Sequence, residues 1–311
     1  MSDMIFQGTV LGPPLWNIFF QDASIPIRQS SCEVIVYADD LNALRVFPAS
    51  TSDAAVLGRL RSCQTKLHAW GSANQVSFDP SKESFHILSR LYGERAAVGP
   101  NFRALGIDFD CKFSMNDAVT DCVAACSWKL NAILRTHRYY NVADLVRLYK
   151  AHVLSFIEYR TPGLSHAAAT CLAPLDAIQA TFLRKLGISS EEALFHFKLA
   201  PLHTRRDIAL LGVVHRSAIG RGPPQLRRIF RKLPAIMGPS RRHRLQIEDL
   251  AANFTQDYIK RSALGKVNVY NNLPSDVVES SMTVKLFQSA IQDLLMQRCA
   301  AGDITWPDCF R

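Results

Sequence analysis

The chain has 311 residues, of which 48% are hydrophobic and 20% are charged. This composition is typical of a globular protein and excludes wholesale disorder. No apolar run approaches the ~18 residues that a membrane-spanning helix needs, and the N-terminus lacks the basic and apolar parts of a secretory signal. We therefore expect an intracellular protein, nuclear or cytoplasmic, without a membrane partner. The eight cysteines contain no Cys-x-x-Cys pair, which favours reduced thiols over a disulfide scaffold.

The net charge of +9 is concentrated in one segment of the chain. Residues 208–247 contain no Asp or Glu, and their basic residues are Arg216, Arg221, Arg227, Arg228, Arg231, Lys232, Arg241, Arg242 and Arg244. Clustered arginines favour a polyanion partner, because phosphate contacts release counterions. The last seven residues of this set are therefore candidate nucleic-acid contacts. A solvated basic loop is the alternative that composition leaves open.

The first 114 residues mix short apolar runs with turns, a texture typical of an α+β domain. Two short apolar runs flank an Asp-Asp pair, and a stretch with apolar residues at steps of three and four follows them. Two further apolar runs lie on either side of a turn-rich stretch. The expected strands are 34–38, 41–47, 84–88 and 102–107, and the expected helix is 51–70.

From residue 115 onward the pattern is helical, and we expect two all-α regions, 115–200 and 201–311. Asn141 and Asp144 resemble a capping box in which Asp replaces the usual Glu, and they predict the start of a helix. A Gly-Arg-Gly-Pro-Pro stretch at 220–224 interrupts the helical pattern and opens the basic segment. The expected helices are 141–159, 174–186, 201–219 and 282–298.

The clearest chemical feature is the run VIVYADD at 34–40, in which a strand-forming sequence leads directly into Asp39 and Asp40. Burying neighbouring carboxylates is costly, and a divalent cation would compensate their charge. Mg²⁺ suits a site that combines a few carboxylates with phosphate oxygens. An ordinary hairpin turn, in which Asp side chains bond to the backbone, is the structural alternative. The apolar frame and the neighbouring motifs favour the metal site.

The order of the motifs resembles that of a reverse transcriptase, most closely the polymerases of non-LTR retrotransposons. QGTVLGPPLWN at 7–17, YADD at 37–40, FDPSKES at 78–84 and FRALGIDFD at 102–110 are similar to motifs B, C, D and E of that family. Later segments are similar to its helical thumb and post-thumb region, namely 145–160, 175–187, 205–216 and 271–278. The resemblance implies an α+β fold. Residues 1–114 would form a partial polymerase palm, an antiparallel sheet with packing helices, followed by an all-α thumb and a helical, basic C-terminal region.

The resemblance also implies nucleotidyl transfer with Mg²⁺, or Mn²⁺, on an RNA template with a DNA primer and deoxynucleotide triphosphates. Asp39 and Asp40 match the metal-binding aspartates of the family. Lys82 matches a lysine that would assist the departing pyrophosphate, and an exposed lysine after a turn is the alternative. The residues that would line the nucleotide and template pocket are Gln7, Gly8 and Tyr37.

The family needs a further metal-ligand aspartate on a strand that precedes the Gln7–Gly8 loop, and the sequence given starts six residues before Gln7. We therefore expect an N-terminally truncated polymerase remnant that is inactive, or nearly so, alone. One alternative is a non-catalytic nucleic-acid-binding protein that uses residues 208–247. Another is the poorly folding product of a retired reading frame.

Overall fold

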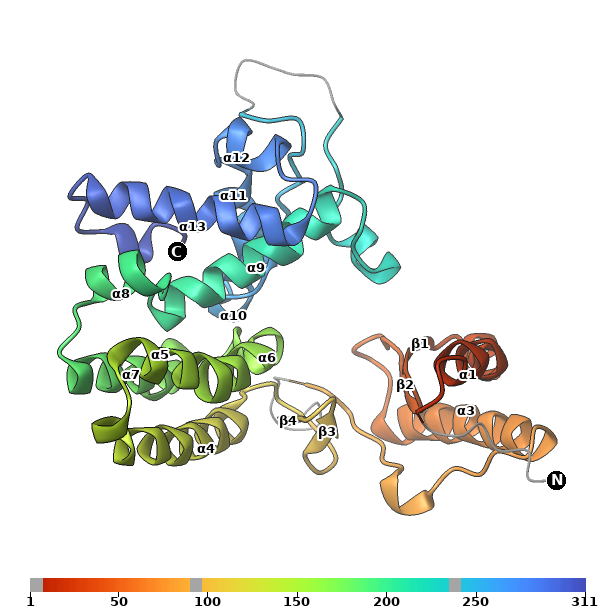
Figure 1. The fold of residues 1–311 in the computed structure, drawn as a ribbon. Coiled ribbons are helices and arrows are strands. Elements are labelled where there is room, and N and C mark those ends of the chain that lie inside the picture. The colour runs from red at the N-terminus through yellow and green to blue at the C-terminus, as the bar shows by residue number, and fades with distance from the viewer. Residues whose placement is uncertain (1–7, 90–96, 235–241) are drawn as a thin grey trace. The chain divides into compact units, whose positions relative to one another are not determined.

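The computed structural model describes residues 8–89, 97–234 and 242–311. It divides into two compact units, Met1–Phe102 and Arg103–Arg311. Helices dominate, and the strands of the described residues form small two-stranded sheets (Figure 1), so the α+β class is confirmed at this coarse level. Within the described ranges, none of the helices combines the length and apolar character needed to span a bilayer.

The first unit contains a β-hairpin and three α-helices. Its described elements are α1 (Gly12–Phe20), α2 (Ser24–Gln29), β1 (Glu33–Tyr37), β2 (Asp40–Leu44) and α3 (Asp53–Ala73). The strands are antiparallel, with Val34 opposite Ala43 and Val36 opposite Leu41. The predicted hairpin and the predicted helix are confirmed. The strand predicted at 84–88 is wrong, because Ile87 pairs with Val98 in an isolated bridge and no described strand includes it.

The core of the first unit is small and lies between the hairpin and the helices. Ile27 of α2, Cys32 and Cys63 of α3 are buried together, and Val34 and Leu41 of the hairpin pack against them. One face of the hairpin therefore packs against the helices. The steps of three and four in the sequence of α3 predict one apolar face for this helix, and Cys63 on that face belongs to the cluster.

Aromatic rings join α1 to the end of α3. Trp16 stacks on Phe20 with ring centroids 4.9 Å apart. Phe20 in turn meets Trp70 edge-on at 5.7 Å. Such pairs stabilise a contact beyond the area that they bury, so α1 has a defined position beside the helix that supports the hairpin.

A small sheet of β3 (Phe102–Ala104) and β4 (Ile107–Phe109) precedes the helices of the second unit. The single strand predicted at 102–107 is wrong, because Leu105 and Gly106 form a turn with φ of 48° and 76°. Ile107 and Phe109 pack against the first helical core. This packing explains why the division between the units falls at residue 102, whereas the sequence placed it at 114.

The first helical core lies among five α-helices. They are α4 (Asn116–Arg135), α5 (Val142–Tyr149), α6 (Ser155–Leu164), α7 (Ala169–Leu186) and α8 (Ser190–Phe197). Asn141 caps α5 as predicted, since its side chain accepts a hydrogen bond from the Asp144 N–H at 2.9 Å. The predicted helix 141–159 is present, but a π-helical turn at Lys150–Leu154 separates α5 from α6.

The second helical core is built around α9 (Leu202–Ala218) and α13 (Val284–Ala300), which lie side by side (Figure 1). Three short helices complete it, namely α10 (Asp257–Lys260), α11 (Val267–Asn271) and α12 (Ser275–Glu279). His215 of α9 stacks on Phe287 of α13 with ring centroids 4.1 Å apart. The predicted helices 201–219 and 282–298 are therefore confirmed.

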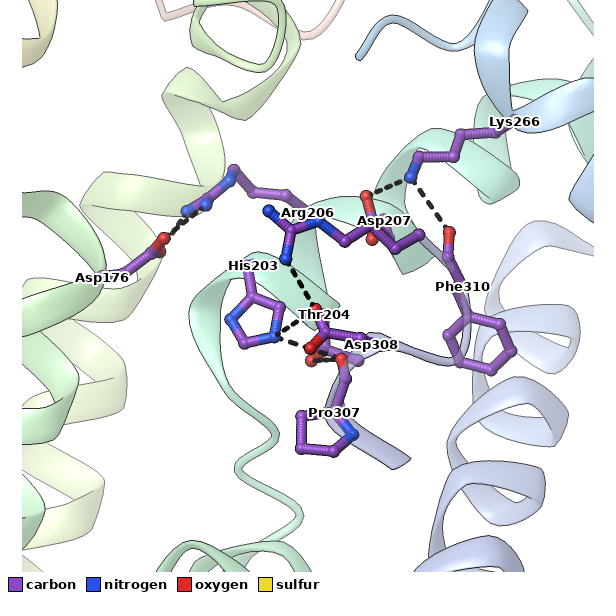
Figure 2. Close-up of polar contacts among 10 residues, drawn as sticks. Asp176, His203, Thr204, Arg206, Asp207, Lys266, Pro307, Asp308 and Phe310 are labelled. Carbon is purple, nitrogen blue, oxygen red and sulfur yellow. Dashed lines mark hydrogen bonds and ion pairs between the residues drawn. The ribbon is translucent and has the colours of Figure 1, made fainter. Parts of the chain in front are cut away.

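The two cores interlock around residue 200, where the sequence predicted a domain boundary. Leu199 belongs to the first core, whereas Ala200 belongs to the second. Arg206 of α9 forms a bidentate ion pair with Asp176 of α7, at 2.6 and 2.8 Å (Figure 2). The helical halves therefore form one unit.

The α9 helix also binds the C-terminal residues. The Thr204 hydroxyl donates to the Pro307 carbonyl at 2.6 Å. Figure 2 shows Lys266 between Asp207 and the Phe310 carbonyl, with its Nζ 2.6 Å from Asp207 Oδ1 and 2.9 Å from the carbonyl oxygen. Since Phe310 is also buried in the second core, these polar contacts fasten the end of the chain to α9.

Candidate functional site

The Asp39–Asp40 pair lies at the tip of the β1–β2 hairpin. Tyr37 pairs with Asp40, so the connecting turn consists of Ala38 and Asp39 alone, and Asp40 is the first residue of β2. Ala38 has φ of 54°, in the left-handed region that L-residues other than glycine rarely adopt. A two-residue hairpin loop requires positive φ at its first position, and the chain meets this requirement with an alanine.

Trp16 fixes the outer side of this turn. Its indole N–H donates to the Ala38 carbonyl at 2.9 Å. Because Trp16 also stacks on Phe20, the turn is joined to α1 and, through α1, to the aromatic contacts with α3.

The hairpin has one face toward the helices and one face away from them. Val34 and Leu41 lie on the inner face and pack against the core of the first unit. Paired residues of an antiparallel sheet share a face, so Tyr37 and Asp40 lie together on the outer face. Both are exposed, and so is Asp39. The structure thus brings Tyr37 and Asp40 together at an accessible hairpin tip, with Asp39 beside them in the turn.

Two carboxylates are the metal-binding groups that this tip offers. In the described ranges, no group of three or more His, Cys, Asp or Glu side chains could hold a metal ion. Mg²⁺ is commonly bound by one or two carboxylates and completes its coordination with waters and substrate phosphates. Asp39 and Asp40 fit that donor set when a phosphate-bearing substrate supplies the remaining oxygens.

Two further predicted residues belong to the loop before α1. Gln7 lies outside the described residues. Gly8 is exposed with φ of 90°, and, apart from its chain neighbours, no described residue has an atom within 4 Å of the position that a Cβ would occupy. The backbone at Gly8 is therefore open to close approach by a ligand, and Thr9 links it to α1 by accepting a hydrogen bond from the Gly12 N–H at 3.1 Å.

Lys82 lies in a turn that is separate from the β1–β2 hairpin in the sequence. It is the last residue of a 3₁₀ turn, Pro80–Lys82, which begins where the Asp79 side chain accepts from the Ser81 N–H at 3.0 Å. Lys82 is exposed, and no contact among the described residues joins it to Asp39 or Asp40. Lys82 therefore stays a predicted site residue, exposed at the end of this turn.

Asp110 is held by the backbone. Its carboxylate accepts from the N–H groups of Lys112, Ser114 and Met115, at 2.7 to 3.0 Å. Burial raises the pKa of Asp110, but these hydrogen bonds outweigh that effect and hold the pKa below its ordinary value. They also secure a turn in which Met115, fully buried, has φ of 62° immediately before α4.

The basic segment is shorter than its composition suggests. Its first part belongs to α9, where Leu211 and Val214 are buried in the second core. The exposed basic residues begin in the last turn of α9, and those described are Arg216, Arg221, Arg227, Arg228, Arg231, Lys232, Arg242 and Arg244. Arg241 lies outside the described residues.

Backbone contacts order the described part of the basic segment. Lys232 pairs with Ile247 in an antiparallel bridge, and the Glu248 N–H donates to the Arg231 carbonyl at 2.8 Å. A Cβ on Gly220 would lie 3.7 Å from Lys232 Nζ, so this ammonium is close to the turn after α9. Arg231 Nη1 lies 3.9 Å from Glu248 Oε2. Lys232 forms no ion pair with any described residue. The described part of the segment therefore has an ordered backbone, and its exposed cations form few ion pairs with carboxylates.

The sequence reasoning passed over two buried histidines. His215 is fully buried, with Nδ1 3.1 Å from the Tyr270 hydroxyl and Nε2 2.9 Å from the Ser281 carbonyl oxygen. His243 is also buried, and its Nε2 is 3.0 Å from the Tyr270 carbonyl oxygen. Burial lowers the pKa of both imidazoles. The position of His215 on the apolar side of the predicted helix was the sequence signal for its burial. Both histidines form part of the second core.

Comparisons of the chain with models of protein families, with curated proteins and with solved structures gave no match.

Proposed function

We propose that the hairpin tip at Tyr37–Asp40 is the metal-binding element of an RNA-directed DNA polymerase, and that the second unit supplies its helical thumb. The geometry of the turn carries the proposal. Two exposed carboxylates stand at the tip of an apolar hairpin whose connecting residue Ala38 has φ of 54°. Backbone strain of this kind is typical of sites where function fixes the conformation. The YADD sequence and the order of the neighbouring motifs support the same function.

In this function Asp39 and Asp40 bind Mg²⁺ together with the phosphate oxygens of a deoxynucleotide triphosphate. The metal, when bound, would activate the primer hydroxyl and offset charge on the phosphates. Tyr37 shares the outer face with Asp40, and its ring is 65% exposed and free to contact the sugar or base. Gly8 leaves its backbone open to the template. Lys82, exposed on its own turn, would assist the departing pyrophosphate.

Binding of Mn²⁺, measured by electron paramagnetic resonance with and without dTTP, tests the metal site directly. We expect the nucleotide to strengthen Mn²⁺ binding to the full chain. Asp39→Asn and Asp40→Asn should each abolish that effect. Asp22→Asn is the matched control, because Asp22 is an exposed carboxylate of the same unit. Nucleotide-dependent binding that survives both hairpin substitutions refutes the metal site.

Incorporation of labelled deoxynucleotide on a primed RNA template tests the polymerase function itself. Because the sequence predicts that this chain is inactive, or nearly so, alone, we expect little incorporation. Robust incorporation that depends on Mg²⁺ or Mn²⁺ and is lost in Asp39→Asn would support the metal site and overturn the prediction that the chain is inactive alone. Incorporation that is unchanged in Asp39→Asn would assign the chemistry to other residues.

A second candidate function is nucleic-acid binding through the basic segment without catalysis. The observation that favours it is the row of exposed cations after α9, where Arg227 and Lys232 form no ion pair with any described residue. Exposed cations that lack carboxylate partners gain most from phosphate contact, because no ion pair must be broken.

A salt titration of oligonucleotide binding tests this second function. Replacing Arg227, Arg228, Arg231 and Lys232 by Ala should weaken binding and reduce the log–log salt slope by ~0.9 per lost duplex contact. The matched control removes the same charge elsewhere in the second unit, by Ala at Arg184, Lys185, Lys285 and Arg298, all of them exposed. Equal effects of the two variants would show that net charge alone governs binding.

A further inference from the structure

A second acid-free stretch runs through the end of α4 and the turn that follows. Residues 122–143 contain no Asp or Glu, and they include three aromatic side chains with unusually high exposure. Trp128 is 72% exposed, Tyr139 83% and Tyr140 49%. Large aromatic residues are usually mostly buried, and a group of them on one surface marks a contact site.

Trp128 lies on the outer face of α4. The inner face carries the buried residues Cys122, Cys126 and Leu130, which belong to the first helical core. At 100° per residue, Trp128 and Arg135 point away from that core and lie about two turns apart on the same side. Arg135 is also exposed. An exposed indole and an exposed guanidinium therefore share one stripe of the helix.

The turn after α4 continues this surface on an ordered backbone. His137 Nδ1 donates to the Leu134 carbonyl at 2.7 Å, and the Tyr139 N–H donates to the Thr136 carbonyl at 2.9 Å. Asn141 then caps α5. Local hydrogen bonds thus order the backbone on both sides of the exposed rings, which limits the entropy lost when a ligand binds.

The charges of this surface are of one sign. Arg135 and Arg138 are exposed, and neither forms an ion pair with any described residue. The nearest carboxylate along the chain, that of Asp144, accepts a hydrogen bond from Arg147 at 3.1 Å. Among the residues that the structure describes, the surface therefore combines cations without acidic partners and aromatic side chains without ring partners.

We propose that this surface, defined as Trp128, Arg135, Arg138, Tyr139 and Tyr140, binds single-stranded nucleic acid. Unstacked bases have faces that stack on exposed rings, and the phosphates between them pair with guanidinium groups. A duplex offers its phosphates but keeps its bases stacked, so it gains little from the rings. The inference takes its ligand class from the proposed nucleic-acid function, but it shares no residue with the basic segment.

Fluorescence anisotropy of labelled dT20, U20 and a 20-base-pair duplex, titrated with the full chain at two salt concentrations, tests the proposal. Replacing Trp128, Tyr139 and Tyr140 by Ala should raise the Kd for single strands at least ~10-fold. It should leave the salt slope and duplex binding unchanged, because no charge is removed. Replacing Arg135 and Arg138 by Ala should instead reduce the single-strand slope by ~1.4, at ~0.7 per contact.

Two control variants keep the result interpretable. Trp128→Phe retains a ring and should bind within ~3-fold of the native chain. Ala at Phe195, Phe254 and Ile304, three exposed apolar side chains outside the surface, should leave the Kd unchanged. A similar loss in this second control would mean that exposed apolar area in general, and not the proposed surface, drives binding, and would overturn the proposal.

The outcomes separate this proposal from that for the basic segment. Native affinity of the aromatic triple variant, together with weaker binding by the basic-segment variant, overturns this proposal alone. The reverse pattern overturns the basic segment alone. Failure of the native chain to bind any of the three probes overturns both, and leaves the exposed aromatic and arginine side chains as the kind of surface that binds another protein.

Discussion

Removal of the Lys266 ammonium should destabilise the second unit strongly. Lys266 is 6% exposed in its side chain and forms an ion pair with Asp207 at 2.6 Å. Loss of one partner from a buried ion pair leaves the other charge uncompensated and typically costs about 3–5 kcal/mol. We therefore expect Lys266→Met to lower the opening free energy of α9 and α13 by at least ~3 kcal/mol, a ~100-fold loss of amide protection.

A double substitution isolates the charge from the packing. In Lys266→Met with Asp207→Leu, neither charge of this buried pair remains, so most of the stability should return. The Phe310 carbonyl still lacks the donor that Lys266 supplied at 2.9 Å, and an unmade hydrogen bond costs about 1 kcal/mol. The double variant should therefore lie about 1 kcal/mol below the native chain.

The dependence on pH provides an independent check. Burial raises the pKa of Asp207, and the Lys266 ammonium acts against that rise. A carboxyl group with a raised pKa in the folded state binds protons more tightly there than in the unfolded state. Its folded form is therefore favoured at low pH, and this advantage fades as the pH rises through the folded pKa. The deficit of Lys266→Met should accordingly be smaller near pH 4 than at pH 7.

Hydrogen exchange of peptides from α9 and α13 in the full chain measures these effects without contributions from the first unit. A double variant that is as unstable as Lys266→Met would refute the reasoning, because the loss would then come from packing. A deficit of the single variant that is constant between pH 7 and pH 4 would refute the electrostatic part.

Four further substitutions, at three positions, test the local geometry by the same exchange method. Asp110→Asn should reduce protection at the start of α4 by about 1–2 kcal/mol. Because the folded pKa of Asp110 is lowered, the loss of protection should be full at neutral pH and should fade as the pH falls through the lowered pKa. A loss that persists at low pH would show that the shape of the side chain, and not its charge, is responsible. Gly71→Ala should destabilise the end of α3 by about 1–3 kcal/mol, since its Cβ would lie 2.6 Å from the Val76 carbonyl oxygen, and native protection would contradict that close approach. Ala38→Gly should keep or raise the protection of β1 and β2, whereas Ala38→Val should lower it by at least ~1 kcal/mol, because a β-branched residue resists φ of 54°.

Local patterns in the sequence predicted the elements that local contacts determine. The apolar residues on both sides of Asp39 and Asp40 predicted the hairpin. The spacing of Val56, Cys63 and Leu67 predicted α3. Both patterns arise because one face of the hairpin and one face of α3 pack in the same small core. Asn141 predicted its helix start because a cap acts within four residues. These signals need no knowledge of the rest of the chain.

Features that depend on distant contacts or on rare backbone states were outside the reach of such patterns. The propensity of Ala38 does not indicate a left-handed turn, so the sequence did not show that Asp40 belongs to β2. The π turn at Lys150–Leu154 leaves no mark in the spacing of apolar residues. Composition counted residues 208–218 as part of a basic segment, although their apolar side chains belong to a helix that packs on α13.

Few contacts hold the hairpin tip that carries the candidate carboxylates, so the position of the tip depends strongly on Trp16. The cluster that packs against the hairpin contains three buried residues, and Ile35 and Tyr37 on the outer face of the hairpin are 51% and 65% exposed. Packing alone therefore holds the tip weakly. The indole hydrogen bond to Ala38 links the strained turn to α1, and α1 starts in the loop that contains Gly8. Under the proposed function, a ligand at Gly8 and a metal at Asp39 would therefore act on elements that this one hydrogen bond joins.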